Sequence, residues 1–317
     1  MSFQPKNVLF FGATGAIGSY ILDAVLSARA EFDRLVIFTS QTTVQNKSTL
    51  LADLKEKYKV EVIVGDIQDE DAVKKAYEGI DTVVSAVGRG AIATQLPLIR
   101  LANASPSVKW FFPSEYGTDV AYSPASASEK PHQQKLKVRA LLENKTEVPD
   151  LAYTYVVTGP FADYYVRFSG AREAGGWDVK NKKATLLSDR GESKISLTTM
   201  KDVGILTLAA LRHPAAAFNK ALRVNSFTTT PAEIQAEFER QTGGQPWSDV
   251  TYTSLETLRQ SEAAAWESGS PAATVWTLRR IWTEGGTLYE QRDNALIGEP
   301  AMQTLTDVVS EAVRQAS

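Results

Sequence analysis

The chain has 317 residues, of which 43% are hydrophobic and 22% are charged, and its formal net charge is −3. This composition is typical of a globular protein with a substantial core, and the slightly negative charge without a Lys/Arg cluster argues against nucleic-acid binding. The absence of cysteine excludes disulfides and thiol chemistry, and with only His132 and His213 as histidines the sequence also argues against a metal site.

The first predicted element is a buried strand over residues 7–11, which leads through a glycine-rich turn into a helix. Three glycines stand three residues apart at this joint. In a dinucleotide fingerprint they permit a tight turn, a close approach of backbone amides to pyrophosphate, and close packing of the helix on the strand. Because the turn follows a strand and opens a helix, we predict a nucleotide site at the positive end of that helix. Its predicted members are Gly12, Thr14, Gly15, Ala16, Ile17 and Gly18.

A second strand is predicted over residues 34–38, and the residues beyond its tip bear on the choice of coenzyme. An acidic side chain at this place favours the free ribose diol of NAD, whereas hydroxyl groups and cations favour the 2′-phosphate of NADP. Thr39 and Ser40 follow the strand, Lys47 stands a little further on, and no acid precedes Asp53. We therefore predict NADP(H) as the coenzyme, with an ordinary polar loop as the alternative interpretation.

Four further strands are predicted, at residues 60–64, 82–87, 108–112 and 151–157. Helical segments separate them, and this regular alternation predicts a doubly wound parallel α/β sheet, a Rossmann fold, with right-handed crossovers. Ligands of such a sheet lie outside the carboxyl ends of its strands. The residues that we expect beside the coenzyme on this ground are Ala86, Val87, Gly88 and Phe161.

A helix that carries several cations is predicted between the fifth and sixth strands. Glu115 follows the fifth strand, and a Ser/Pro/Ala-rich segment at residues 123–128 has the composition of a mobile loop over the site. In the helix beyond it, His132, Lys135 and Arg139 share one face at three- and four-residue spacing. These residues are therefore candidates for the chemistry.

Beyond residue 160 the regular alternation lapses and five of the six tryptophans appear. Most of them are expected in a core, although a pocket for a planar compound would use some. We therefore predict a dinucleotide-binding domain at residues 1–160 and a smaller, mainly substrate-binding domain at residues 161–317. Its candidate strands, one or both of which could return to the main sheet, are at 184–187 and 223–225, and its candidate helices are at 200–211, 231–242 and 304–314.

These residues resemble the NmrA-like and isoflavone-reductase-like branch of the atypical short-chain dehydrogenases, over most of the chain. The segment Gly12–Gly18 is similar to the dinucleotide turn of the family, Phe112–Gly117 looks like its strand-end signature, and Lys135 matches the lysine of its reductase branch. Residues 153–156 and 161–165 resemble the strand and turn beside the nicotinamide. The resemblance implies an NADP(H)-dependent reductase of an aromatic or heterocyclic natural product, in secondary metabolism.

Two features depart from the pattern of the family. Thr39 and Ser40 stand where the reductases commonly carry an arginine. No tyrosine is followed by a lysine four residues later, so the tyrosine–lysine pair of typical short-chain dehydrogenases is absent. Any proton chemistry must therefore use other groups.

We assign the proton transfer to Lys135, which is also expected to contact the coenzyme. Burial beside a coenzyme and near Arg139 disfavours the charged form of a lysine and brings its pKa toward the working pH. Glu115 is expected to orient Lys135 or to hold a substrate hydroxyl, and His132 to serve as a second proton relay. His213 is interpreted as structural.

Two other functions remain compatible with these residues. An isomerase or cyclase would use the nicotinamide without net redox change, and a non-enzymatic dinucleotide sensor would bind a partner protein. The early first strand leaves no room for a signal peptide, and no apolar run is long enough to span a membrane. We therefore expect a cytoplasmic protein, a monomer or homodimer, whose partner is a small-molecule substrate.

Overall fold

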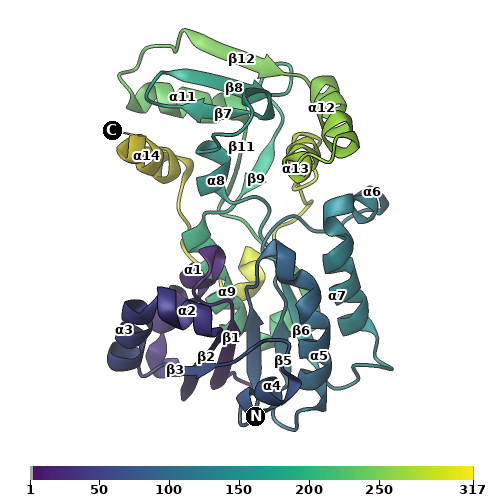
Figure 1. Ribbon diagram of the computed structural model, residues 1–317. Coiled ribbons are helices and arrows are strands. Elements are labelled where there is room, and N and C mark those ends of the chain that lie inside the picture. Colours follow the sequence, from purple (N-terminus) through teal and green to yellow (C-terminus); the bar gives the residue numbers. More distant parts are fainter. Residues whose placement is uncertain (1–2, 317) are drawn as a thin grey trace.

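The computed structural model describes residues 3–316 and consists of a large α/β part beneath a smaller second part (Figure 1). The central sheet has seven strands in the order β10-β6-β5-β4-β1-β2-β3, and every neighbouring pair is parallel. The predicted doubly wound sheet is thus confirmed. Its strands are β1 (Asn7–Phe11), β2 (Arg34–Thr39), β3 (Glu61–Val64), β4 (Thr82–Ser85), β5 (Trp110–Phe112), β6 (Ala152–Val157) and β10 (Lys220–Arg223).

Helices cover both faces of this sheet, and the alternation of side chains along β1 shows why. Val8 and Phe10 belong to one buried cluster, whereas Leu9 and Phe11 belong to the cluster on the opposite face. The helices of the first cluster are α1 (Ala16–Ser27), α3 (Ser48–Tyr58), α9 (Met200–Arg212) and α10 (Pro214–Ala217). Those of the second are α4 (Glu70–Ala76), α5 (Gln95–Ala104) and α7 (Gln133–Glu143).

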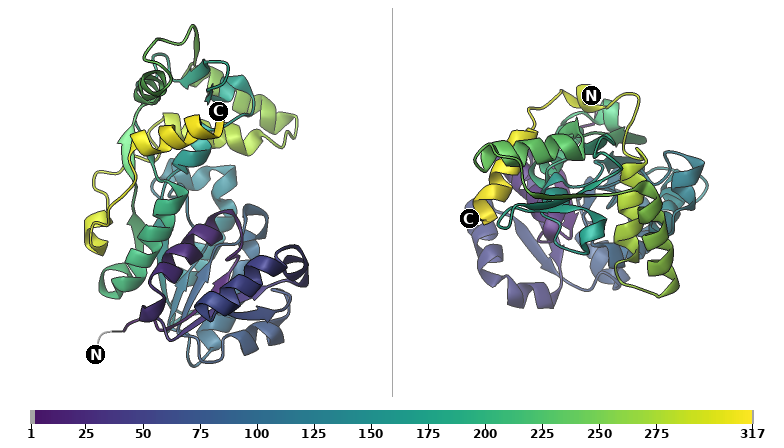
Figure 2. Two further views of the ribbon diagram at one scale, coloured as in Figure 1. Left: turned by 90° about the vertical axis from the view of Figure 1, so that its left-hand side faces the viewer. Right: turned by 90° about the horizontal axis from the view of Figure 1, so that it is seen from above.

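The smaller part is built around two short sheets. One is three-stranded, with β8 (Lys183–Leu187) between β7 (Gly176–Asp178) and β12 (Asp249–Thr253), and the other pairs β9 (Ile195–Leu197) with β11 (Phe227–Thr229). Trp177 and Trp247 pack with Phe238 in its core, as expected for most tryptophans. Its helices are α8 (Ala162–Val166), α11 (Pro231–Gln241), α12 (Leu255–Glu267), α13 (Ala273–Thr283) and α14 (Leu305–Ala316). Helix α14 packs against α8 and α11 (Figure 2).

The chain passes between the two parts more than once. After β9 it returns to the large part, where α9 packs against α1 and β10 adds an edge strand beside β6. The candidate strand at 223–225 is therefore this edge strand, shifted a few residues toward the N-terminus, whereas the candidate strand at 184–187 is β8 of the small sheet. Of the two candidate strands that could return to the main sheet, one does so.

Two segments interpreted as loops contain short helices. The polar stretch after β2 forms α2 (Gln41–Asn46), because the Ser40 side chain caps it by accepting a hydrogen bond from the Thr43 amide at 3.2 Å. The Ser/Pro/Ala-rich stretch forms α6 (Pro124–Ser128), which Ser123 caps in the same way. No helix within residues 3–316 has the length and apolar character that a membrane span requires.

Candidate functional site

The glycine turn brings three backbone segments into contact at the carboxyl end of β1. Gly12 has a φ of +74°, and a Cβ added there would lie 2.5 Å from the carbonyl oxygen of Ala86. A Cβ at Gly18 would lie 2.0 Å from the carbonyl oxygen of Gly12. The turn therefore abuts the residues that follow β4, Ala86 and Val87, and forms a cradle of tightly packed backbone at the start of α1.

Replacement of Gly12 by alanine is expected to lower the free energy of unfolding by about 1–3 kcal/mol. The substitution forces an L-residue into the left-handed region, and its methyl group would clash with the backbone carbonyl of Ala86. Urea unfolding measures the effect. The matched control is Gly90→Ala, because a Cβ at Gly90 meets no atom of the described residues within 4 Å. Equal stability of the two variants would contradict this account of the turn.

A cavity of about 590 Å³ opens from this cradle toward the tips of β2 and β3. Its lining combines apolar side chains such as Phe38 and Ile67 with a row of hydroxyl residues, namely Thr14, Thr39, Ser40, Thr42 and Thr43, and it also includes Gly12 and Asp66. The Asp66 carboxylate stabilises the turn after β3, since it accepts a hydrogen bond from the Gln68 amide at 2.9 Å. The Lys47 ammonium reaches across the mouth of the turn and donates to the carbonyl of Thr14. The cradle and these hydroxyl groups fit a dinucleotide with an extra phosphate.

A second cavity, of about 280 Å³, lies outside the carboxyl ends of β5 and β6. Lys135, His132 and Phe161 line it from the large part and from the turn after β6, whereas α13 closes it from the smaller part. Gly88 lies apart from its lining, as an exposed residue at the start of the 3₁₀ turn η2 (Arg89–Thr94). Both cavities thus lie at the edge of the sheet where ligands of this fold bind.

The Lys135 side chain is turned inward from α7. Its ammonium donates a hydrogen bond to the backbone carbonyl of Glu115. Burial lowers the pKa of Lys135 to about 8; the nearby Glu115 carboxylate opposes this shift, and the cations Arg89 and Arg139 add to it. Arg89 was not foreseen as part of this site, whereas the influence of Arg139 was.

Glu115 and Arg139 form a buried ion cluster behind Lys135. Arg139 donates to both carboxylate oxygens of Glu115, at 3.1 and 2.8 Å, and to Asp119 at 2.8 Å. Burial alone would raise the pKa of Asp119, but contacts with Arg139 and Arg223 hold it below its usual value. Glu115 therefore orients Lys135 through its backbone carbonyl. Its carboxylate is occupied and does not line the cavity, which argues against a contact with a substrate hydroxyl.

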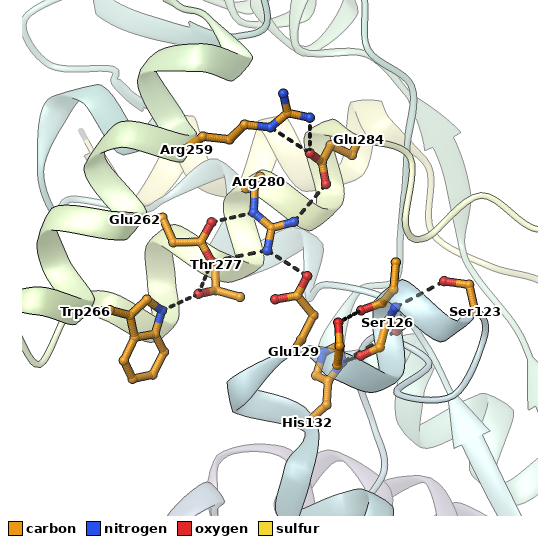
Figure 3. Close-up of polar contacts among 12 residues, drawn as sticks. Ser123, Ser126, Glu129, His132, Arg259, Glu262, Trp266, Thr277, Arg280 and Glu284 are labelled. Atoms are coloured by element: carbon orange, nitrogen blue, oxygen red, sulfur yellow. Dashed lines mark hydrogen bonds and ion pairs between the residues drawn. The ribbon is translucent and has the colours of Figure 1, made fainter.

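His132 lies at the wall of the same cavity with one ring nitrogen free. Its Nδ1 lies 2.7 Å from the carbonyl oxygen of Ser126, so this nitrogen carries the proton (Figure 3). Burial lowers the pKa of His132 and thereby favours the neutral ring. Within the described part of the chain its buried Nε2 has no hydrogen-bond partner. His132 thus places a neutral ring with a free acceptor in the wall of the cavity, one turn from Lys135.

Sequence reasoning expected some of the later tryptophans in a pocket without saying which, and it missed Arg279 of α13. Trp282 lines the cavity and donates from Nε1 to the Thr118 hydroxyl at 2.9 Å, which joins the smaller part to the loop after β5. Arg279, one helical turn earlier, is 2% exposed and also lines the cavity. The apolar spacing of α13 was the available signal, but it does not indicate which element the helix faces.

Arg280 fastens the same helix to the segment that leads into α7. It donates to Glu129 at 2.7 Å and to Glu284 at 2.8 Å, and it also pairs with Glu262 of α12 (Figure 3). Because Glu129 lies three residues before His132, this cluster holds the wall of the cavity against the smaller part. His213, in contrast, only closes the end of α9, with Nδ1 2.8 Å from the Ala209 carbonyl oxygen.

Comparisons with known proteins agree with this geometry. Residues 4–260 match the model of the NmrA-like family. The chain is 31% identical over 263 residues to an isoflavone reductase of Pisum sativum, which covers 79% of this chain and 80% of that protein. A crystal structure of isoflavone reductase superposes with a TM-score of 0.78 at 25% identity, covering 98% and 100% of the two chains. The leucoanthocyanidin reductase–NADPH complex of Vitis vinifera, at 22% identity, has the same fold with a TM-score of 0.78 over 97% and 99%.

Proposed function

This chain belongs to the NmrA-like family, and we propose that it is an NADPH-dependent reductase of an aromatic small molecule. The observation that carries the proposal is the Lys135 amine, whose pKa burial lowers to about 8 and which lines an aromatic-walled cavity at the edge of the sheet that holds the glycine cradle. Relatives of similar length are named isoflavone reductase and phenylcoumaran benzylic ether reductase. Their names support this reaction class.

Residues of the cradle would hold the coenzyme, which supplies a hydride when bound. Gly12, Gly15 and the start of α1 would receive the pyrophosphate. Thr39, Ser40 and Lys47 would surround the 2′-phosphate, and Ala86, Val87, Gly88 and Phe161 would flank the nicotinamide half. Lys135 would then deliver a proton to the substrate atom that gains negative charge, and the Nε2 of His132 would accept a hydrogen bond from a substrate hydroxyl.

The coenzyme assignment predicts a selective effect of Lys47→Ala. NADPH affinity should fall about tenfold or more, because a charge-assisted contact with the 2′-phosphate is lost, while NADH affinity should stay unchanged. Titration of coenzyme fluorescence measures both constants. Lys57→Ala is the control, since Lys57 pairs with Asp53 on the exposed side of α3. Equal losses for NADPH and NADH would refute the role of Lys47.

The reductase proposal itself is tested by stoichiometry. Purified protein is incubated with NADPH and a panel of isoflavones and phenylpropanoid ethers, and NADPH consumption is compared with product formed. A reductase consumes one coenzyme for each product molecule. A redox-neutral isomerase or cyclase turns over on catalytic coenzyme, and a sensor binds NADPH without turnover. Either of these outcomes would refute the proposal.

A further inference from the structure

Arg279 is a buried cation that pairs with no carboxylate among residues 3–316. Its side chain lies among the rings of Tyr165, Phe168 and Trp282, with its Cζ 4.3, 4.6 and 5.6 Å from their centroids. Nη2 donates a long hydrogen bond of 3.4 Å to the Tyr165 carbonyl, and Nη1 has no partner among the described residues. A buried guanidinium left in this state is costly, because no carboxylate within residues 3–316 neutralises its charge.

The neighbouring Arg280 shows what a structural arginine of this helix looks like. Its side chain is more exposed, at 13%, yet it pairs with three carboxylates, those of Glu129, Glu262 and Glu284 (Figure 3). Arg279 pairs with none within residues 3–316. The two adjacent arginines therefore differ in role: one joins segments of the chain, and the other presents an unused donor at the cavity.

The charged residues that line the cavity are all cations. Arg89, Lys135 and Arg279 line it, His132 adds a neutral ring, and no Asp or Glu is among its lining residues in the described chain. Its remaining wall is largely aromatic, with Tyr116, Phe161, Tyr164, Tyr165, Phe168 and Trp282. Such a cavity favours a ligand that combines a flat apolar framework with a negative group.

We infer that the substrate of this reductase is an aromatic carboxylate whose carboxyl group Arg279 binds while the aromatic wall holds its ring. The inference rests on the proposed function, since it names the substrate class of the same site. A carboxylate matches the fork of a guanidinium and would satisfy the free Nη1. The phosphates of a dinucleotide have their own place, because the cradle and the Thr39–Ser40 hydroxyls line the other cavity.

The test compares trans-cinnamate with its neutral isostere trans-cinnamamide. Both are titrated into the protein saturated with NADPH, and binding is followed by calorimetry and by intrinsic tryptophan fluorescence. The native protein should bind cinnamate about tenfold or more tightly than cinnamamide. Arg279→Met should abolish this preference by weakening cinnamate alone, Arg279→Lys should retain part of it, and the exposed Arg259→Met should leave it unchanged.

The outcomes separate this inference from the proposed function. Arg279→Met removes an unpaired buried charge, so it should fold at least as stably as the native protein, which a thermal melt verifies. If cinnamate and cinnamamide bind equally to the native protein, or weaken equally in Arg279→Met, the inference is overturned while NADPH binding and turnover still stand. A parallel loss of NADPH affinity in Arg279→Met would also overturn it, by placing Arg279 on the coenzyme.

Discussion

Replacement of Lys135 by methionine is expected to slow single-turnover oxidation of NADPH by substrate about a hundredfold to ten-thousandfold, the usual contribution of a positioned acid. Methionine keeps the length and apolar contacts of the stem but has no proton to give. NADPH binding should weaken much less than the rate. The control is Lys137→Met, an exposed lysine of the same helix, which should react at the native rate.

The pH dependence of the reduction rate of the native protein tests the role of Lys135 as the acid independently. Burial lowers the pKa of Lys135 to about 8, so the ammonium that donates the proton is present below this pH and is lost above it. The rate of substrate reduction should therefore be constant at lower pH and should fall about tenfold for each pH unit well above 8. A rate that stays level or rises between neutral and alkaline pH would remove Lys135 from the role of acid.

Replacement of Arg139 by methionine is expected to lower the free energy of unfolding by about 3–5 kcal/mol. The side chains of Glu115 and Asp119 are each 1% exposed, and Arg139 pairs with both. Without Arg139, the buried Glu115 carboxylate loses both of its guanidinium hydrogen bonds, and Asp119 keeps the half-exposed Arg223 and the amide of Ala121 as donors. Urea unfolding near neutral pH measures the loss.

An exposed ion pair of similar geometry serves as the control for Arg139→Met. Arg34 donates to both carboxylate oxygens of Glu61 at 2.9 and 2.7 Å, but the pair is open to solvent, so Arg34→Met should cost about 1 kcal/mol or less. Adding Glu115→Gln and Asp119→Asn to Arg139→Met should recover part of the lost stability, because the stranded charges disappear. Similar losses for Arg34→Met and Arg139→Met would contradict the importance of burial.

Most of the large part could be predicted because its signals are local. Buried parallel strands read as apolar runs, and the glycine turn and the alternation of strands with helices are visible in sequence order. In the small sheets only β8 was predicted, and β7, β9 and β11 escaped prediction because they have three residues each, too few to show a period of two. The shape of the second part comes from tertiary packing, for which the sequence has no local counterpart.

The candidate site, too, could be predicted only in part. Lys135 was identified from its resemblance to a family lysine, and the structure turns it into a cavity beside His132 and Phe161. Which atom of Glu115 holds Lys135 could not be foreseen, because the choice between carbonyl and carboxylate depends on where Arg139 lies. Arg279 was missed because an arginine in an amphipathic helix looks like any solvated charge until the facing element is known.

The return of the chain to the main sheet constrains how such a protein can change in evolution. The edge strand β10 and the helix α9 that covers α1 are both encoded after the first strands of the smaller part. A gene fragment cut at residue 160 would leave the edge of β6 bare and the apolar side of α1 uncovered. A single junction at residue 160 therefore cannot exchange the smaller part as a unit, because segments encoded beyond it complete the large part.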